Sequence, residues 1–182
     1  MATDAGWWAA IIAERLSQGD LILDQTFLIP VAPTVFLKSR SFKGGEPGWG
    51  QSAVPTNGKG GERFLAAGAV KPALVISHDC DLDKALEDPD GPAGYRVLAA
   101  PVAPINTVDP AMQTLILSQQ VKAMLPLQGC PGLGDCYADL RLVMAVPRVA
   151  VDAGKRVASM ADVARARLRA QLVEFFVRLE QP

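Results

Sequence analysis

A short polar string that follows a buried strand carries most of the reactive side-chain types of this 182-residue chain. The string SHDCD covers residues 77–81, directly after the apolar pair Val75 and Ile76. It contains the only histidine, His78, and one of the three cysteines, Cys80. The acidic residues of the segment are Asp79, Asp81 and Asp83. These residue types suit nucleophilic catalysis, metal binding or a polar turn, and each use makes different demands on the neighbouring residues.

In the first interpretation, Cys80 is a nucleophile and His78 is its general base. Side chains two residues apart on a strand share a face, which would place the two together. The adjacent carboxylates count against this arrangement, because reactive cysteines usually lie in electropositive surroundings that stabilise the thiolate. The catalytic dyad is therefore the least favoured of the three interpretations.

In the second interpretation, His78 and Cys80 bind a zinc ion together with Cys130 and Cys136. Three cysteines and one histidine form a common structural zinc set. The spacing of the second pair is long, since five residues separate Cys130 from Cys136, whereas zinc pairs usually have about two to four. The aspartates alternatively suit Mg²⁺, a hard cation that prefers oxygen ligands.

In the third and favoured interpretation, the string is a structured turn. Aspartates that follow a strand accept backbone N–H bonds and shape the next loop. Such a turn at the rim of a folded domain is also a usual place for ligand contacts. We expect a ligand groove between residues 39–61 and residues 78–83, with contacts from Trp49, Asp79, Cys80 and Asp83.

Hydrophobic periodicity predicts the elements that position these residues. Apolar residues at helical spacing predict an amphipathic helix over residues 5–17. A second helix is expected over residues 110–124, where Asp109 caps and Pro110 takes the first position. A third runs from Ser159 through the C-terminus. The predicted strands cover residues 21–29, 35–38, 70–77, 94–102 and 138–146. Loops are expected over the glycine-rich residues 39–61, the acidic residues 79–90 and the turn-rich residues 128–135.

Composition limits the class of protein. No apolar run approaches the roughly 18 residues that a membrane-spanning helix needs. The N-terminus MATDAGWWAAII has no basic residue before its apolar part, as a secretory signal would have. We therefore expect a cytoplasmic protein with no membrane partner. The net charge of −1 provides no general attraction to nucleic acid, so RNA is not the favoured partner.

Basic residues are concentrated near the C-terminus. Residues 148–182 contain seven basic side chains and only four acidic ones. A local excess of this kind is typical of a solvated helix face rather than of a phosphate site. We interpret it in that way.

Five stretches, in order, resemble the MazF/PemK toxin superfamily. They are GDLIL at 19–23, VKPALVIS at 70–77, VLAAPV with PINT at 97–107, DLRLVMAVPRV at 139–149 and the helix opening SMADV at 159–163. That family has an SH3-like barrel with a C-terminal helix, commonly works as a homodimer, and contains endoribonucleases held by an antitoxin. The resemblance implies a homodimeric barrel with a protein partner, either an antitoxin or a defence component.

The resemblance also implies where RNA-cleaving residues would stand. Lys71 matches the position of an arginine before the proline of the second strand, and Thr107 matches a threonine that ends the third. His78 and Asp81 would complete the site, with His78 moving the proton of the attacking 2′-hydroxyl and Lys71 stabilising the phosphate. Lysine lacks the planar fork with which arginine holds a phosphate, so cleavage is not the first choice.

We predict one domain, residues 1–182, that is mainly β with helices. It comprises an N-terminal helix over 1–18, an SH3-like barrel over 19–152 with a helical insertion at 110–124, and a C-terminal helix over 159–180. The favoured function is a binding or regulatory module of a toxin–antitoxin or phage-defence locus. The alternatives are a MazF-like endoribonuclease and a zinc-binding structural or interaction protein, and zinc or Mg²⁺ enters only through the metal-dependent alternatives.

Overall fold

The structure is a computed structural model that describes four ranges of the chain: residues 6–12, 14–29, 67–87 and 96–177. The chain divides into two compact units, one formed by Met1–Gln25 with Val70–Pro182 and the other by Thr26–Ala69. The expected strand at 35–38 and the expected loop at 39–61, with Trp49, lie outside the described residues.

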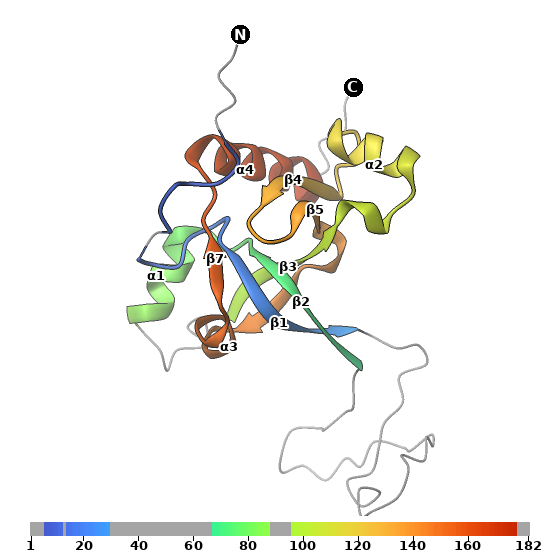
Figure 1. Cartoon of the computed structure of the whole chain (residues 1–182). Coiled ribbons are helices and arrows are strands. Elements are labelled where there is room, and N and C mark those ends of the chain that lie inside the picture. Colours follow the sequence, from blue (N-terminus) through green and yellow to red (C-terminus); the bar gives the residue numbers. More distant parts are fainter. Residues whose placement is uncertain (1–5, 13, 30–66, 88–95, 178–182) are drawn as a thin grey trace, which may run out of the picture. The chain divides into compact units, whose positions relative to one another are not determined.

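An antiparallel sheet that curls into a half-barrel forms the centre of the larger unit (Figure 1). Its hydrogen-bonded order is β4-β5-β3-β2-β1-β7, and β6 also pairs with β3. The strands are β1 Leu21–Ile29, β2 Ala67–Val75, β3 Arg96–Pro104, β4 Met124–Cys130, β5 Gly134–Asp139, β6 Met144–Pro147 and β7 Arg156–Ala158. The predicted strands at 21–29, 70–77 and 94–102 are therefore confirmed as β1, β2 and β3.

The sheet is organised around β3, which pairs with three other strands. Its first part, around Val97, pairs with β6, its middle around Ala100 pairs with β2, and its last part around Val102 pairs with β5. These three side chains are buried together with Ala99. A run of buried residues, rather than strict alternation, is expected where a strand is covered on both faces. The curl of the sheet provides that cover.

Four α-helices lie in the described part of the chain: α1 Asp79–Glu87, α2 Pro110–Leu117, α3 Arg148–Ala153 and α4 Asp162–Val177. The start of α2 is confirmed, because Asp109 Oδ1 accepts the N–H of Met112 at 3.0 Å and Pro110 takes the first position. The helix ends at Leu117, well before residue 124. Gln119 there adopts a φ of 59°, which turns the chain toward β4.

The predicted C-terminal helix is confirmed as α4, and its apolar face completes the core. Ala164 and Leu168 are buried in one cluster with Trp7, Leu125 and Leu127. Leu125 and Leu127 belong to β4, beside which α4 lies in Figure 1. The helical spacing of the apolar residues predicts this burial, which stabilises the fold through the hydrophobic effect.

The predicted N-terminal helix over residues 5–17 is wrong. The described residues of this segment form an irregular chain in which Trp8 makes a β-bridge with Met160. Ile11 is 82% exposed while Trp7 is buried, so the apolar side chains do not act as one stripe. A large aromatic side chain removes more apolar surface from water in a deep site between elements than on one face of a short helix, and a short helix is only weakly stable by itself. Tertiary packing therefore overrides the helical spacing.

The expected acidic loop that begins at residue 79 is also wrong, because its first nine residues form α1. The backbone oxygen of His78 accepts the N–H of Asp81 at 2.9 Å and that of Leu82 at 3.2 Å. Leu82 is buried, which attaches the helix to the core. Carboxylates in the first turn, here Asp79 and Asp81, favour a helix start through the positive end of its dipole.

Two further differences concern the second half of the chain. The expected loop at 128–135 contains the turn of a β4–β5 hairpin, and the expected strand at 138–146 is divided by a 3₁₀ turn at Leu140–Leu142. The three-residue strand β7 is too short to show a period of its own. It exists because Leu21 and Ile22 of β1 pair with it.

Replacing Leu168 with alanine tests the role of α4. Leu168 is fully buried in the core cluster, so the truncation should lower the free energy of unfolding by about 2–5 kcal/mol. Val163→Ala on the same helix is the matched control, because Val163 is exposed and should change stability by less than about 0.5 kcal/mol. Urea unfolding followed by circular dichroism measures both. Equal effects of the two variants would contradict the proposed packing of α4.

Candidate functional site

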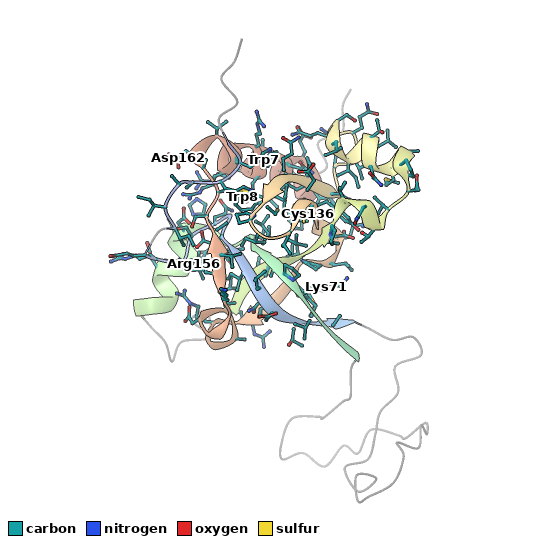
Figure 2. The ribbon with its side chains drawn as sticks, in the orientation of Figure 1. Trp7, Trp8, Lys71, Cys136, Arg156 and Asp162 are labelled. Atoms are coloured by element: carbon teal, nitrogen blue, oxygen red, sulfur yellow. The ribbon has the colours of Figure 1, made fainter. Side chains whose placement is uncertain are left out.

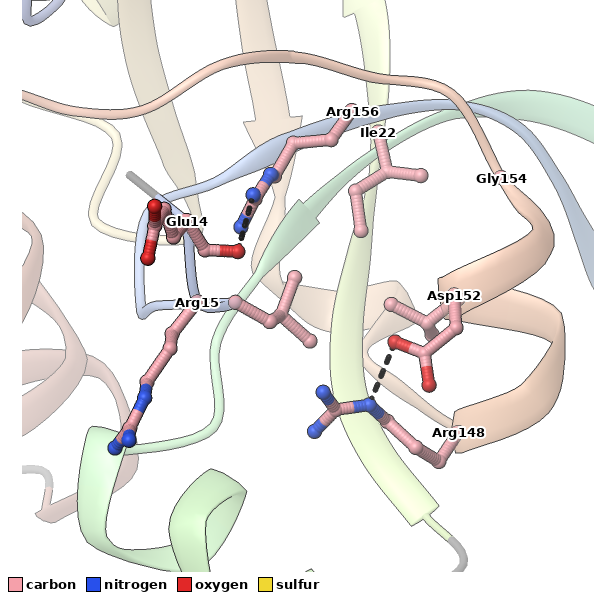
Figure 3. A pocket seen from close by; sticks show the side chains of 9 residues that line it. Glu14, Arg15, Ile22, Arg148, Asp152, Gly154 and Arg156 are labelled. Atoms are coloured by element: carbon pink, nitrogen blue, oxygen red, sulfur yellow. Dashed lines mark hydrogen bonds and ion pairs between the residues drawn. The ribbon is translucent and has the colours of Figure 1, made fainter. Parts of the chain in front are cut away.

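A cavity of about 420 Å³ opens between the N-terminal segment, β1 and the chain from α3 to β7. Three arginines line it, each from a different segment: Arg15, Arg148 and Arg156 (Figure 3). Glu14 and Asp152 are its acidic residues. The aliphatic part of the wall is made by Leu16, Ile22 and Val151. The cavity therefore combines an apolar wall with cationic groups, which is the usual composition of a small-molecule site.

Arg156 is held in place by a buried carboxylate. Its Nη1 donates to Asp20 Oδ2 at 3.1 Å, and the Asp20 side chain is 0% exposed. Its Nη2 donates to the backbone oxygen of Glu14 at 2.9 Å. Asp20 Oδ2 also accepts the N–H of Ser17 at 2.8 Å. A buried charge requires such partners, so Asp20 ties β7 to both ends of the turn that precedes β1.

Arg148 enters the cavity from the first turn of α3. Its Nε donates to Asp152 Oδ1 at 2.8 Å, one helical turn further on, and its Nη1 donates to the backbone oxygen of Leu82 in α1 at 3.4 Å. The side chain is only 12% exposed. These bonds hold its guanidinium between α3 and α1, at the edge of the cavity.

Arg15 differs from the other two arginines of the cavity. It is exposed, and its guanidinium makes no hydrogen bond or ion pair with any other part of the chain that the structure describes. Arg148 and Arg156, by contrast, each face a carboxylate. Arg15 is therefore the cationic group of the cavity with unused donor capacity.

The segment that carries Arg15 is anchored at its start by two indoles. Trp7 Nε1 donates to Gln128 Oε1 at 3.0 Å, and Trp8 Nε1 donates to the Gln128 backbone oxygen at 2.9 Å. Figure 2 shows both tryptophans beside the β4–β5 hairpin, near Cys136. The segment is thus held by these indoles and by the backbone bridge between Trp8 and Met160, not by helical hydrogen bonds.

A close approach of Gly154 to β1 shapes the opposite wall. A Cβ atom added at Gly154 would lie 2.6 Å from Ile22 Cγ2 and would also collide with Gln25 Nε2. Gln25 in turn donates to the backbone oxygen of Ala150 in α3 at 3.2 Å. Only glycine allows the chain after α3 to pass this closely over β1.

The SHDCD string serves as a joint between elements. Asp79 Oδ1 accepts the N–H of Gln18 at 2.7 Å, and its Oδ2 accepts Arg169 Nη2 of α4 at 3.3 Å. His78 Nδ1 accepts the N–H of Cys80 at 3.3 Å. Asp79 thus accepts a backbone N–H, as the turn interpretation expects, although the segment is a helix start. Cys80 and Asp83, the other ligand-contact candidates here, are exposed on α1.

The four residues of the zinc hypothesis do not come together. Cys130 and Cys136 lie in the β4–β5 hairpin, whereas His78 and Cys80 lie at the start of α1. Within the described ranges, no three His, Cys, Asp or Glu side chains are grouped so that they could hold a metal ion. The geometry gives this hypothesis no support.

The residues of the nuclease hypothesis come from different elements: Lys71 from β2, His78 and Asp81 from the start of α1, and Thr107 from the 3₁₀ turn Ile105–Thr107. Lys71 and Val75 are separated by about 13 Å at the usual rise of a strand, and His78 and Asp81 follow beyond Val75. Thr107 follows the end of β3 that pairs with β5, and its Oγ1 donates to the Pro104 oxygen at 2.7 Å. The structure thus places Lys71 apart from His78 and Asp81, which follow the other end of β2. The nuclease activity stays a prediction.

Comparison of the sequence with protein-family models and with curated proteins finds no match. The resemblance to the MazF/PemK superfamily is therefore neither supported nor contradicted by these comparisons. Among the described helices, none has the length and apolar character needed to cross a membrane.

Sequence reasoning missed the arginine-lined cavity, although one signal pointed to it. Arg148 and Arg156 belong to the basic excess of residues 148–182, which we interpreted as a solvated helix face. Neither residue lies on α4. Their common cavity depends on a turn at Gly154 and on Arg15, which is distant in sequence, so spacing alone does not reveal it.

Replacing Arg156 with alanine tests the buried ion pair. The change leaves the Asp20 carboxylate buried without its cation, which should lower the free energy of unfolding by about 3 kcal/mol. Adding Asp20→Asn to Arg156→Ala removes the unpaired charge and should restore part of that loss. Lys155→Ala, an exposed neighbour, is the control and should have an effect within about 0.5 kcal/mol. If chemical denaturation gives the same stability for Arg156→Ala and Lys155→Ala, the pair has no structural role.

Proposed function

We propose that this chain is a ligand-binding module whose cavity takes a small organic anion. The observation that carries the proposal is that Arg15, Arg148 and Arg156 line one cavity of about 420 Å³. Guanidinium groups bind carboxylates and phosphates through paired, charge-assisted hydrogen bonds. A cavity of this volume lies within the usual range for small-molecule sites.

The charges of the cavity favour one anionic group rather than several. Arg156 is paired with Asp20, and Arg148 is paired with Asp152. The unpaired Arg15 is then the group that gains most from an incoming carboxylate or phosphate, because its donors have no competing acceptor in the described chain. The paired arginines add positive charge at positions that their carboxylate partners hold in place.

The apolar part of the wall indicates the rest of the ligand. Leu16, Ile22 and Val151 offer no hydrogen bonds from their side chains. A hydrocarbon or aromatic body would lie against them and would bury apolar surface on binding. The ligand class is therefore a carboxylate or phosphate monoester with an apolar body.

The same proposal includes the finer fold assignment. We propose that the half-barrel with α4 is a divergent SH3-like barrel of the MazF/PemK type, and that its ligand site serves regulation rather than RNA cleavage. A homodimer and a protein partner from a toxin–antitoxin or defence locus belong to this proposal as well. What supports it is the antiparallel curl of the sheet and the position of α4 in the chain.

Calorimetric titration with phenyl phosphate and with benzoate tests the binding site. Both probes should bind, and the uncharged analogue phenol should not. Arg15→Ala should weaken the binding of both anions at least tenfold, because a hydrogen bond to a charged group contributes about 1.5–3 kcal/mol. Lys122→Ala is the matched control. It removes one positive charge from an exposed side chain outside the cavity, so it should leave the affinity unchanged. Failure of both anions to bind at millimolar concentration, or equal losses in the two variants, would contradict the proposal.

The nuclease alternative makes a separate prediction. Under the binding proposal, the purified chain at micromolar concentration leaves a mixed-sequence RNA intact, with and without a chelator. Gel electrophoresis of the RNA after incubation measures this. Cleavage that disappears in Lys71→Ala and in His78→Ala would assign endoribonuclease activity and would replace the proposal.

A further inference from the structure

Two buried thiols lie at diagonal positions of the β4–β5 hairpin, none of whose residues lines the arginine-lined cavity. Cys130 is the last residue of β4, and Cys136 is the third residue of β5. Both are reduced and buried, and both belong to the core cluster that contains Trp7. Gly134 is the register partner of Cys130, so no side chain of that partner separates the two sulfur atoms.

The two thiols differ in their acid–base properties because they lie close together. Side-chain hydrogen bonding between them raises the pKa of Cys130 and lowers that of Cys136. Each S–H also lies within hydrogen-bond distance of a backbone oxygen, Cys130 of Leu127 at 3.6 Å and Cys136 of Leu133 at 3.9 Å. Burial and the nearby Asp135 carboxylate raise the pKa of both thiols and so oppose the thiolate of Cys136. The lowered pKa makes Cys136 the better nucleophile of the two, with the Cys130 thiol beside it.

We propose that Cys130 and Cys136 form a reversible disulfide when the protein meets a hydroperoxide. The Cys136 thiolate attacks one peroxide oxygen, the O–O bond breaks, and the leaving hydroxide takes a proton to become water. The Cys130 thiol then attacks the sulfur of the resulting sulfenic acid, and a second water leaves. Two thiols and one hydrogen peroxide thus give one disulfide and two waters.

The hairpin allows the small closure that the new bond requires. A disulfide is about 2.05 Å long, so the two sulfur atoms must move closer together than two separate thiols can lie. The register of the hairpin is irregular between Leu127 and Cys130. The turn contains Gly132 and Gly134, both at positive φ and with open space around the position of a Cβ. A hydroperoxide is small enough to enter when this exposed turn opens.

Formation of the disulfide should change the surroundings of the N-terminal segment. Gln128, two residues before Cys130, accepts the indole N–H groups of Trp7 and Trp8. A movement of this part of β4 therefore changes the environment of both indoles. The intrinsic fluorescence of the protein provides a direct readout that a silent surface oxidation would not affect.

The experiment uses the full chain with Cys80→Ser, since Cys80 is exposed and would otherwise react. One equivalent of hydrogen peroxide should lower the intact mass by about 2 Da and remove both titratable thiols, and dithiothreitol should restore them. The oxidised chain should stay monomeric on a non-reducing gel, show altered tryptophan fluorescence, and melt about 5 °C higher than the reduced chain.

The matched controls carry Cys136→Ser or Cys130→Ser in addition, and neither should lose the 2 Da. An unchanged thiol count in the Cys80→Ser chain would overturn the proposal. A gain of oxygen without the loss of about 2 Da, or a disulfide only between two chains, would overturn it as well. These outcomes do not depend on ligand binding, so they stand apart from the test of the anion site.

Discussion

The buried carboxylate of Asp20 is the interaction on which the rest of the fold depends. It is fully buried and accepts from the Ser17 N–H and from the Arg156 guanidinium. The backbone oxygen of the same residue accepts the N–H of Val75 in β2. A buried charge is stable only with its partners in place, so this one residue aligns the N-terminal turn with β1, β2 and β7.

The arginine-lined cavity follows from that alignment. Arg156 donates both to Asp20 and to the backbone oxygen of Glu14, so it holds the N-terminal segment near β7 and with it the neighbouring Arg15. The opposite wall follows from the close approach of Gly154 to β1. The site is thus built at the junction of the two ends of the chain, where neither end could form it alone.

Residue types that look catalytic have a structural use in this protein. Asp79 joins the N-terminal turn to α1 and, through Arg169, to α4. His78 accepts an N–H at the start of the same helix. The density of polar groups after Val75 is explained by the need to satisfy backbone donors where three elements meet.

Local sequence pattern determined the strands β1, β2 and β3, the capped start of α2, and α4. Each of them follows from a hydrophobic period or a capping residue within the segment itself. Tertiary structure alone decided the N-terminal segment, where the contacts of Trp7 and Trp8 with Gln128 outweigh helical spacing. It also decided β7, which needs β1 as its partner. The meeting of Arg15 with Arg148 and Arg156 was equally beyond sequence reasoning, since side chains more than 130 positions apart come together only after the chain has folded.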